Sequence, residues 1–210
     1  MNIILMGCPG AGKGTQSAKL KEYFSLTHIS TGDVLRAEIA SGSALGKEVS
    51  EIINQGNLVP DKLMISILEN IVKTTDKGII FDGFPRTVAQ AEALDAMMKG
   101  LNREITQVIM IDLPEEEVVN RICGRRLCKK CGAVVRVDVT APAEVCPSCN
   151  GELYTRADDT PQRAKHRLEV YKQDTLPVKT YYQNSGKYTV VNGAQTPEQV
   201  FGDLVKILTK

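Results

Sequence analysis

The chain has 210 residues, of which 42% are hydrophobic and 24% charged, an ordinary composition for a globular protein with a sizeable core. The formal net charge is only +1, so the chain as a whole has no field that would draw it to nucleic acid or to a membrane surface. No apolar run approaches the roughly 20 residues that a membrane-spanning helix needs, and the N-terminus does not resemble a secretory signal, which together predict a cytoplasmic protein.

The first residues predict a strand, a glycine-rich loop and a helix. Residues 2–6 form an apolar run typical of a buried parallel strand, and residues 7–15 read Gly-Cys-Pro-Gly-Ala-Gly-Lys-Gly-Thr. Glycines let successive backbone N–H groups turn toward a phosphate, and the following helix adds its positive N-terminal end. A glycine turn without a ligand is the simpler alternative, but the flanking strand and helix favour a phosphate-binding loop. The loop residues expected to bind ATP are Gly10, Ala11, Gly12, Lys13, Gly14 and Thr15.

Strands and helices then alternate along the chain. Further strands are expected at 78–81, 107–113 and 187–192, and helices start near Ser30, Leu63, Pro114, Thr160 and Pro197. The helix that starts after Thr160 is expected to run to about Asp174. This alternation predicts an α/β fold, with a P-loop NTPase-like parallel sheet core flanked by helices.

A cysteine-rich module interrupts this pattern at residues 124–159. Cys128-x-x-Cys131 and Cys146-x-x-Cys149 are separated by fourteen residues, close to the spacing of tetrahedral zinc sites, and residues 134–139 alternate as a strand does. Four thiolate ligands leave no open position for water, so the expected Zn²⁺ is structural. A redox pair would need only one such unit. A module of about 35 residues has too little core to be stable alone, which explains the need for a metal.

These motifs, taken together, resemble the adenylate kinases, members of the nucleoside monophosphate kinase family, in the type that has a long zinc-bearing lid. The loop resembles theirs because Gly14 follows Lys13 directly and Thr15 comes next. Segments 30–36, 82–86, 121–126 and 155–159 also match in order, so the resemblance covers residues 1–208. It implies a core of residues 1–29, 60–123 and 160–210, a helical NMP-binding insert at 30–59, and a small zinc-ribbon lid at 124–159.

The implied reaction is reversible transfer of the terminal phosphoryl group from Mg-ATP to AMP, giving two ADP, by a monomer. Such transfer needs positioning and positive charge rather than covalent chemistry from the protein. Asp82 and Thr15 are implied to hold Mg²⁺ through water. Ordinary solvated arginines are the alternative for each guanidinium, and this interpretation is kept for Arg126 and Arg163. The implied catalytic residues are Lys13, Arg86, Arg121, Arg125, Arg156 and Arg167.

The resemblance also divides the binding residues between two nucleotides. On the ATP side it adds Arg121, Arg125, Val134, Val135 and Gln195 to the loop. Gln90 is implied to read the adenine of AMP, because one amide offers both a donor and an acceptor to the purine edge. The implied AMP residues are Thr31, Arg36, Asn57, Leu58, Val59, Gly83, Phe84, Pro85, Arg86, Gln90, Arg156 and Arg167.

Two other functions remain possible from the sequence. A UMP or CMP kinase would share the loop and the arginines, but such enzymes usually have short lids, and Gln90 with Thr31 favours adenine. A zinc-ribbon ATPase that binds nucleic acid would use the basic residues near the cysteines, and it predicts salt-dependent binding of DNA or RNA. We expect small-molecule substrates without nucleic acid or membrane partners. His28 and His166 are assigned no role.

Overall fold

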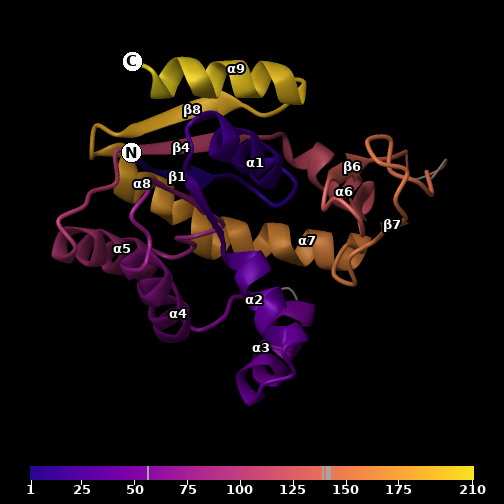
Figure 1. Cartoon of the computed structure of the whole chain (residues 1–210), viewed down its shortest axis with the longest axis horizontal. Coiled ribbons are helices and arrows are strands. Elements are labelled where there is room, and N and C mark those ends of the chain that lie inside the picture. Colours follow the sequence, from indigo (N-terminus) through magenta and orange to yellow (C-terminus); the bar gives the residue numbers. More distant parts are fainter. Residues whose placement is uncertain (56, 139, 141–142) are drawn as a thin grey trace.

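The computed structural model describes residues 1–55, 57–138, 140 and 143–210 (Figure 1). Its centre is a five-stranded parallel sheet with the strand order β2-β3-β1-β4-β8. The strands are β1 (Asn2–Met6), β2 (Thr27–Ser30), β3 (Ile79–Asp82), β4 (Gln107–Asp112) and β8 (Tyr188–Asn192). The sheet confirms the expected α/β core.

Helices cover both faces of the sheet. Alternate residues of β1 point to opposite faces: Ile4 packs with helices α4, α5 and α8, whereas Ile3 packs with α1 and α9. None of the helices among the described residues is both long and apolar enough to cross a bilayer. The helices are α1 (Lys13–Tyr23), α2 (Thr31–Ala40), α3 (Ala44–Gln55), α4 (Asp61–Lys73), α5 (Val88–Gly100), α6 (Glu115–Cys123), α7 (Pro161–Val170), α8 (Leu176–Gln183) and α9 (Pro197–Leu208).

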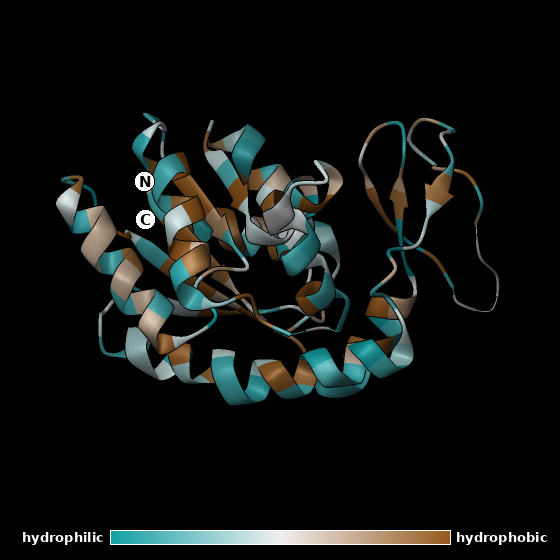
Figure 2. Cartoon of the chain, turned by 90° about the horizontal axis from the view of Figure 1, so that it is seen from below, coloured by the Kyte–Doolittle hydropathy of each residue, from teal (hydrophilic) through white to brown (hydrophobic). Residues whose placement is uncertain are grey.

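Two segments project from this core. Helices α2 and α3 pack against each other beyond the carboxyl end of β2 (Figure 1). A three-stranded antiparallel sheet of β5 (Arg125–Cys128), β6 (Val134–Arg136) and β7 (Leu153–Tyr154) forms the lid and extends away from the core (Figure 2). Strand β6 is shorter than the alternation over 134–139 predicts, since it ends at Arg136, and residue 139 lies outside the described residues.

The structure differs from the sequence prediction at one helix end. The helix that starts after Thr160 does not end near Asp174, because a π-helical turn (Tyr171–Thr175) joins α7 to α8 and the helical path continues to Gln183. Pro177 lies in the first turn of α8, where a missing backbone N–H is tolerated. The π-helical turn interrupts the regular hydrogen-bond ladder just before this proline, so the proline does not end the helical path.

Candidate active site

The glycine-rich loop connects β1 to the N-terminus of α1. Gly10 has φ +83° and Gly12 has φ +96°, values in the left-handed region that glycine adopts without strain. Gly12 occupies the N-cap position of α1 and has no side chain to cap the helix. The first backbone N–H groups of α1 are therefore available to an anion.

Lys13 lies over this loop. Its Nζ donates to the carbonyl oxygens of Gly7 at 2.7 Å and Cys8 at 3.0 Å. Enclosure of the ammonium group by protein lowers the pKa of Lys13 to about 8, opposed by the carboxylate of Asp82 and reinforced by the nearby guanidinium of Arg86. The lysine thus belongs to a compact set of charged groups at the carboxyl edge of the sheet.

Asp82 ends β3 beside the loop. A Cβ added to Gly14 would lie 3.6 Å from Asp82 Oδ2, and His28 Nε2 lies 3.1 Å from the same oxygen. The place of His28 was not predicted from the sequence, because β2, the strand that carries it next to β3, was not predicted. Once β2 is paired with β3, His28 is seen as the neighbour that orients the Asp82 carboxylate.

A hollow opens between the α2–α3 segment and the loop after β3. Every residue implied for AMP lines it except Pro85 and Arg156. Three further apolar residues of its lining, Leu35, Ile53 and Met64, were not predicted from the sequence. The lining residues are Thr31, Gly32, Leu35, Arg36, Ile53, Asn57, Leu58, Val59, Met64, Gly83, Phe84, Arg86, Gln90, Asp158 and Arg167. We call this the acceptor hollow.

A second hollow, which we call the loop hollow, adjoins the glycine-rich loop and contains Lys13 and Pro85. Four residues line both hollows: Leu58, Gly83, Arg86 and Arg167. Two guanidinium groups therefore stand in the wall between the glycine-rich loop and the acceptor hollow. Such an arrangement suits two phosphate groups that approach each other, because the positive charge offsets their mutual repulsion.

Two aspartates of the lid border orient Arg125 and Arg167. Arg125 Nε donates to Asp159 Oδ2 at 2.8 Å, and a second nitrogen of the same guanidinium bonds to Asp159 Oδ1. Arg167 lies 3.0 Å from Asp158 Oδ2 and 3.5 Å from Asp159 Oδ1. Because both carboxylates are largely buried, these pairs are shielded from solvent and hold the guanidinium groups in place.

Arg156 completes the cluster from the acceptor side. One of its nitrogens lies 3.6 Å from Asp33 Oδ1. Burial lowers the pKa of Arg156 to about 10, and the positive charges of Arg125 and Arg36 act in the same direction. Crowding of like charges is unfavourable without a ligand, so the cluster is suited to a polyanion.

The remaining ATP-side residues lie in two places. Arg121 borders the loop: a Cβ on Gly10 would lie 3.4 Å from Arg121 Cβ, and Arg121 also donates to the carbonyl of Gly193 at 3.0 Å. Gln195, two residues further on, donates to the carbonyl of Asn192 at 3.1 Å and to Asp203 Oδ2 at 3.1 Å.

Val134 and Val135 are separated from the loop. They lie on β6 of the lid, paired with Leu127 and Arg126 on β5, and the side chain of Val134 is exposed. Neither valine lines the acceptor hollow or the loop hollow. Their implied contact with the ATP base therefore stays a prediction.

The family model described as adenylate kinase matches residues 5–187. The chain belongs to the adenylate kinase family. It is 47% identical to the adenylate kinase of Archaeoglobus fulgidus over 214 residues, covering 100% of this chain and 99% of that protein. The adenylate kinases of Geobacillus sp. strain WCH70 and Kosmotoga olearia are 45% and 47% identical over 212 residues, with 99% of this chain and 98% and 99% of theirs covered.

Membership of the adenylate kinases decides between the functions that the sequence left open. The enzyme is an ATP:AMP phosphotransferase, and its substrates are ATP and AMP. A UMP or CMP kinase and a nucleic-acid-binding ATPase are not supported. The two adjoining hollows agree with an enzyme that holds two nucleotides at once.

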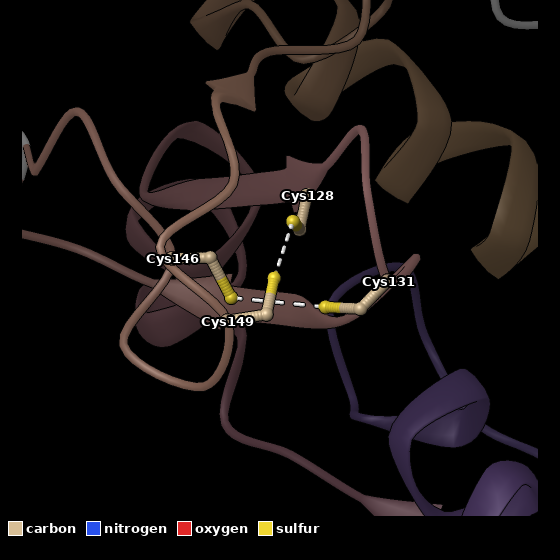
Figure 3. Close-up of side chains that lie close together, drawn as sticks. All are labelled: Cys128, Cys131, Cys146 and Cys149. Carbon is tan, nitrogen blue, oxygen red and sulfur yellow. Dashed lines mark hydrogen bonds between the residues drawn. The ribbon is translucent and has the colours of Figure 1, made fainter.

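The lid of this adenylate kinase brings four cysteines together (Figure 3). The Sγ atoms of Cys128, Cys131, Cys146 and Cys149 all lie within 4.8 Å of one another. The backbone N–H of Cys131, assisted by that of the preceding lysine, lowers the pKa of Cys128. The backbone N–H of Gly151 acts in the same direction on Cys149, but hydrogen bonds with the Cys131 and Cys128 thiols raise the pKa of Cys149. A Cβ on Gly151 would lie only 2.8 Å from Cys128 Sγ, so the backbone approaches the cluster closely. The cluster is consistent with zinc.

Proposed function

We propose that phosphoryl transfer takes place at the wall shared by the two hollows, with Arg86 and Arg167 on either side of the moving group. The observation that supports this most directly is that both arginines line the acceptor hollow and also the loop hollow that contains Lys13. A phosphate oxygen of AMP attacks the terminal phosphorus of ATP, and the bond to the β-phosphate oxygen breaks as ADP leaves. AMP is already ionised near neutral pH, so the reaction needs no strong general base.

The ATP phosphates are assigned to the loop and the adjacent basic groups. Backbone N–H groups of residues 10–15 would surround the phosphate oxygens, and Lys13 would turn from the loop carbonyls to the transferred group. Arg121 and Arg125 would approach from α6 and β5. Val134, Val135 and the backbone of Gln195 are proposed to flank the ATP base.

The AMP phosphate is assigned to Arg36, Arg86 and Arg156, with Arg167 shared between both nucleotides. The position of Arg36 in the acceptor hollow and the closeness of Arg36 and Arg156 support this. The base would lie beside Thr31 and Gln90. The backbone of 57–59 and 83–85 would form the remaining wall.

Two metal ions are proposed. Asp82 lies against the loop, and with Thr15 it would hold Mg²⁺ through water; the ion would supply positive charge at the ATP phosphates when bound. Zn²⁺ would be held by the four lid cysteines and would be structural, because four protein ligands fill a tetrahedral shell.

We further propose that the enzyme has three parts: a core of 1–29, 60–123 and 160–210, the NMP-binding region 30–59, and the lid 124–159. The NMP-binding region and the lid would move relative to the core. Closure of the latter two over the hollows would exclude water, which would otherwise accept the phosphoryl group. The enzyme is proposed to act as a cytoplasmic monomer on small molecules, without nucleic acid or membrane partners. Sedimentation equilibrium tests the monomer, since a dimer would double the measured mass.

The proposed place of transfer is tested by comparing the kcat of Arg167→Ala with that of a control variant, Arg163→Ala. Arg163 lies one helical turn earlier on α7 and donates to the carbonyl of Ala157, outside both hollows. If Arg167 stabilises the transferred group, kcat should fall by about 10³-fold or more, as for other arginines at transferred phosphoryl groups. Arg163→Ala should stay within a few-fold of the parent enzyme.

The measurement is a coupled assay of ADP formation, run with AMP and then with UMP, CMP and GMP. Equal kcat values for the two variants would contradict the proposed place of transfer. A preference for another monophosphate would contradict the proposed role of Thr31 and Gln90. It would not contradict the proposed place of phosphoryl transfer.

A further inference from the structure

The amide of Gln90 is held from both ends by the protein. Its Oε1 accepts a hydrogen bond from the backbone N–H of Arg86 at 2.8 Å, and its Nε2 donates to Asp61 Oδ1 at 2.6 Å. The residue is buried, with 2% of its surface exposed. If the amide were reversed, its NH₂ would face the N–H of Arg86 and its carbonyl oxygen would face a carboxylate oxygen, so only one orientation is compatible with these partners.

Asp61 is itself fixed in place. It is the first residue of α4, directly after Pro60, and its second carboxylate oxygen accepts from the hydroxyl of Thr87 at 3.1 Å. The same hydroxyl caps α5 by accepting from the backbone N–H of Gln90 at 3.1 Å. Asp61, Thr87 and Gln90 thus form a closed ring of hydrogen bonds between the starts of two helices. Asp61 lines neither hollow, so it acts behind the site.

A fixed amide presents a fixed pattern to a base. Beyond the two contacts above, Gln90 retains one amino hydrogen and one carbonyl lone pair. The pairing edge of adenine has an acceptor, N1, beside a donor, the 6-amino group, and this pattern complements the amide. The pairing edge of a 6-oxopurine such as hypoxanthine is reversed, with N1–H as the donor and O6 as the acceptor. An amide that is free to turn over would accept either base, whereas the held amide complements adenine only.

We propose that Asp61 is a positioning residue that sets the selectivity of the acceptor hollow for adenine over 6-oxopurines. It does so by preventing the Gln90 amide from turning over, without touching the nucleotide. The inference rests on the proposed function of Gln90 as the group that contacts the base of AMP.

The first variant is Asp61→Asn, which keeps the shape of the side chain but offers either an oxygen or an NH₂ group to Gln90. The ratio of kcat/KM for AMP to kcat/KM for IMP should fall by about tenfold or more, as expected for loss of a hydrogen bond to a charged group. Most of the change should appear in KM, because the arginines that contact the phosphates are untouched. An unchanged ratio in a folded variant overturns the proposal.

A double-mutant cycle separates positioning from a general structural role. Gln90→Leu removes the amide, so Asp61→Asn should cause no further change in the AMP to IMP ratio when introduced beside it. If Asp61→Asn lowers the ratio equally with and without Gln90, Asp61 does not act through the amide and the proposal is wrong.

Two further variants distinguish a loss of selectivity from a loss of folding or of helix stability. Asp61→Ser keeps a side chain that is favourable at a helix start, and it should show the same loss of selectivity if Asp61→Asn does not fold. Glu198→Gln removes another first-turn acid, in α9 and remote from both hollows, and should leave the ratio unchanged. A similar loss in the Glu198 variant would mean that helix stability, not the amide, determines selectivity.

The same cycle distinguishes failure of this inference from failure of the proposed function. If Gln90→Leu leaves KM for AMP unchanged, Gln90 does not contact the base, and both the proposed role and the inference fall. If Gln90→Leu raises KM for AMP but Asp61→Asn leaves the ratio unchanged, only the role of Asp61 falls.

Discussion

Lys13 is the single side chain whose protonation matters most for the proposed ATP site. Its pKa, lowered to about 8 by the surrounding protein, lies close to the pH at which kinases are commonly assayed. Below this pKa the ammonium carries its charge and attracts phosphate. As the pH rises through the folded-state pKa, the charge is lost.

We therefore expect the Kd for ATP to be nearly constant below about pH 8 and to rise above it, approaching about tenfold per pH unit for one proton. Isothermal titration calorimetry between pH 7 and 9.5 measures this. Binding of AMP serves as the control, since its proposed partners are arginines, which keep their charge over most of this range. An ATP affinity that does not change up to pH 9.5 would contradict a phosphate-binding charge on Lys13 that is lost near pH 8.

The sequence predicts the site residues unevenly, for physical reasons. Asp82 to Arg86 lie in one continuous motif, so their gathering at the end of a strand could be predicted. Leu35, Ile53 and Met64 could not be distinguished from core residues, because an apolar side chain has the same pattern whether it faces a ligand or a neighbouring helix. The contact between Asp61 and Gln90 joins residues on two helices, and no local pattern encodes it.

At the scale of whole elements, the three central strands, whose faces are both buried, were predicted, and so was the edge strand β8. β1, β3 and β4 are almost continuous apolar runs, as strands in a parallel sheet covered by helices must be. β2 lies at the edge of the sheet and only one of its four residues is fully buried, so its hydrophobic signal is weak. α5 was also not predicted, although Thr87 caps it with its side chain.

The lid is the element whose stability should depend on metal. Its small sheet has few buried apolar residues, so removal of Zn²⁺ should lower the melting temperature of the enzyme. The initial rate of the enzyme should fall much less, provided that the assay temperature is below the melting temperature of the metal-free form.

Calorimetry and an initial-rate assay, each with and without a zinc chelator, test this expectation. Readdition of Zn²⁺ is the control for damage by the chelator and should restore the melting temperature. Immediate loss of activity with unchanged melting would show that the metal takes part in catalysis instead.

At the scale of the whole molecule, contacts cross from the proposed NMP-binding region to α7 and to the end of the lid. His166 Nε2 lies 2.8 Å from Asn57 Oδ1, and Arg156 pairs with Asp33. These contacts connect segments that are far apart in the chain and that flank the acceptor hollow. They should therefore favour an arrangement in which the hollow is covered.

Removing the histidine contact should make AMP bind more weakly. For His166→Ala we expect a rise of about 2- to 10-fold in the Kd for AMP, the range for one hydrogen bond, with little change for ATP. His166→Gln, which can still donate to Asn57, should recover most of the affinity. Titration of both variants with each nucleotide measures this, and equal weakening by Ala and Gln would contradict the bridging role.

The chain runs from α6 into the lid and returns from the lid to the core at α7, and these two helices are neighbours. Val118 and Ile122 of α6 pack with Ala164 of α7, and Lys172 pairs with Glu115 at 2.6 Å beyond them. The packing of α6 against α7 therefore fixes the two ends of the lid next to each other, whatever sequence the lid itself has. Evolution can lengthen, shorten or replace such an insert without disturbing the sheet, and so can an engineer who grafts a different cover onto the same catalytic base.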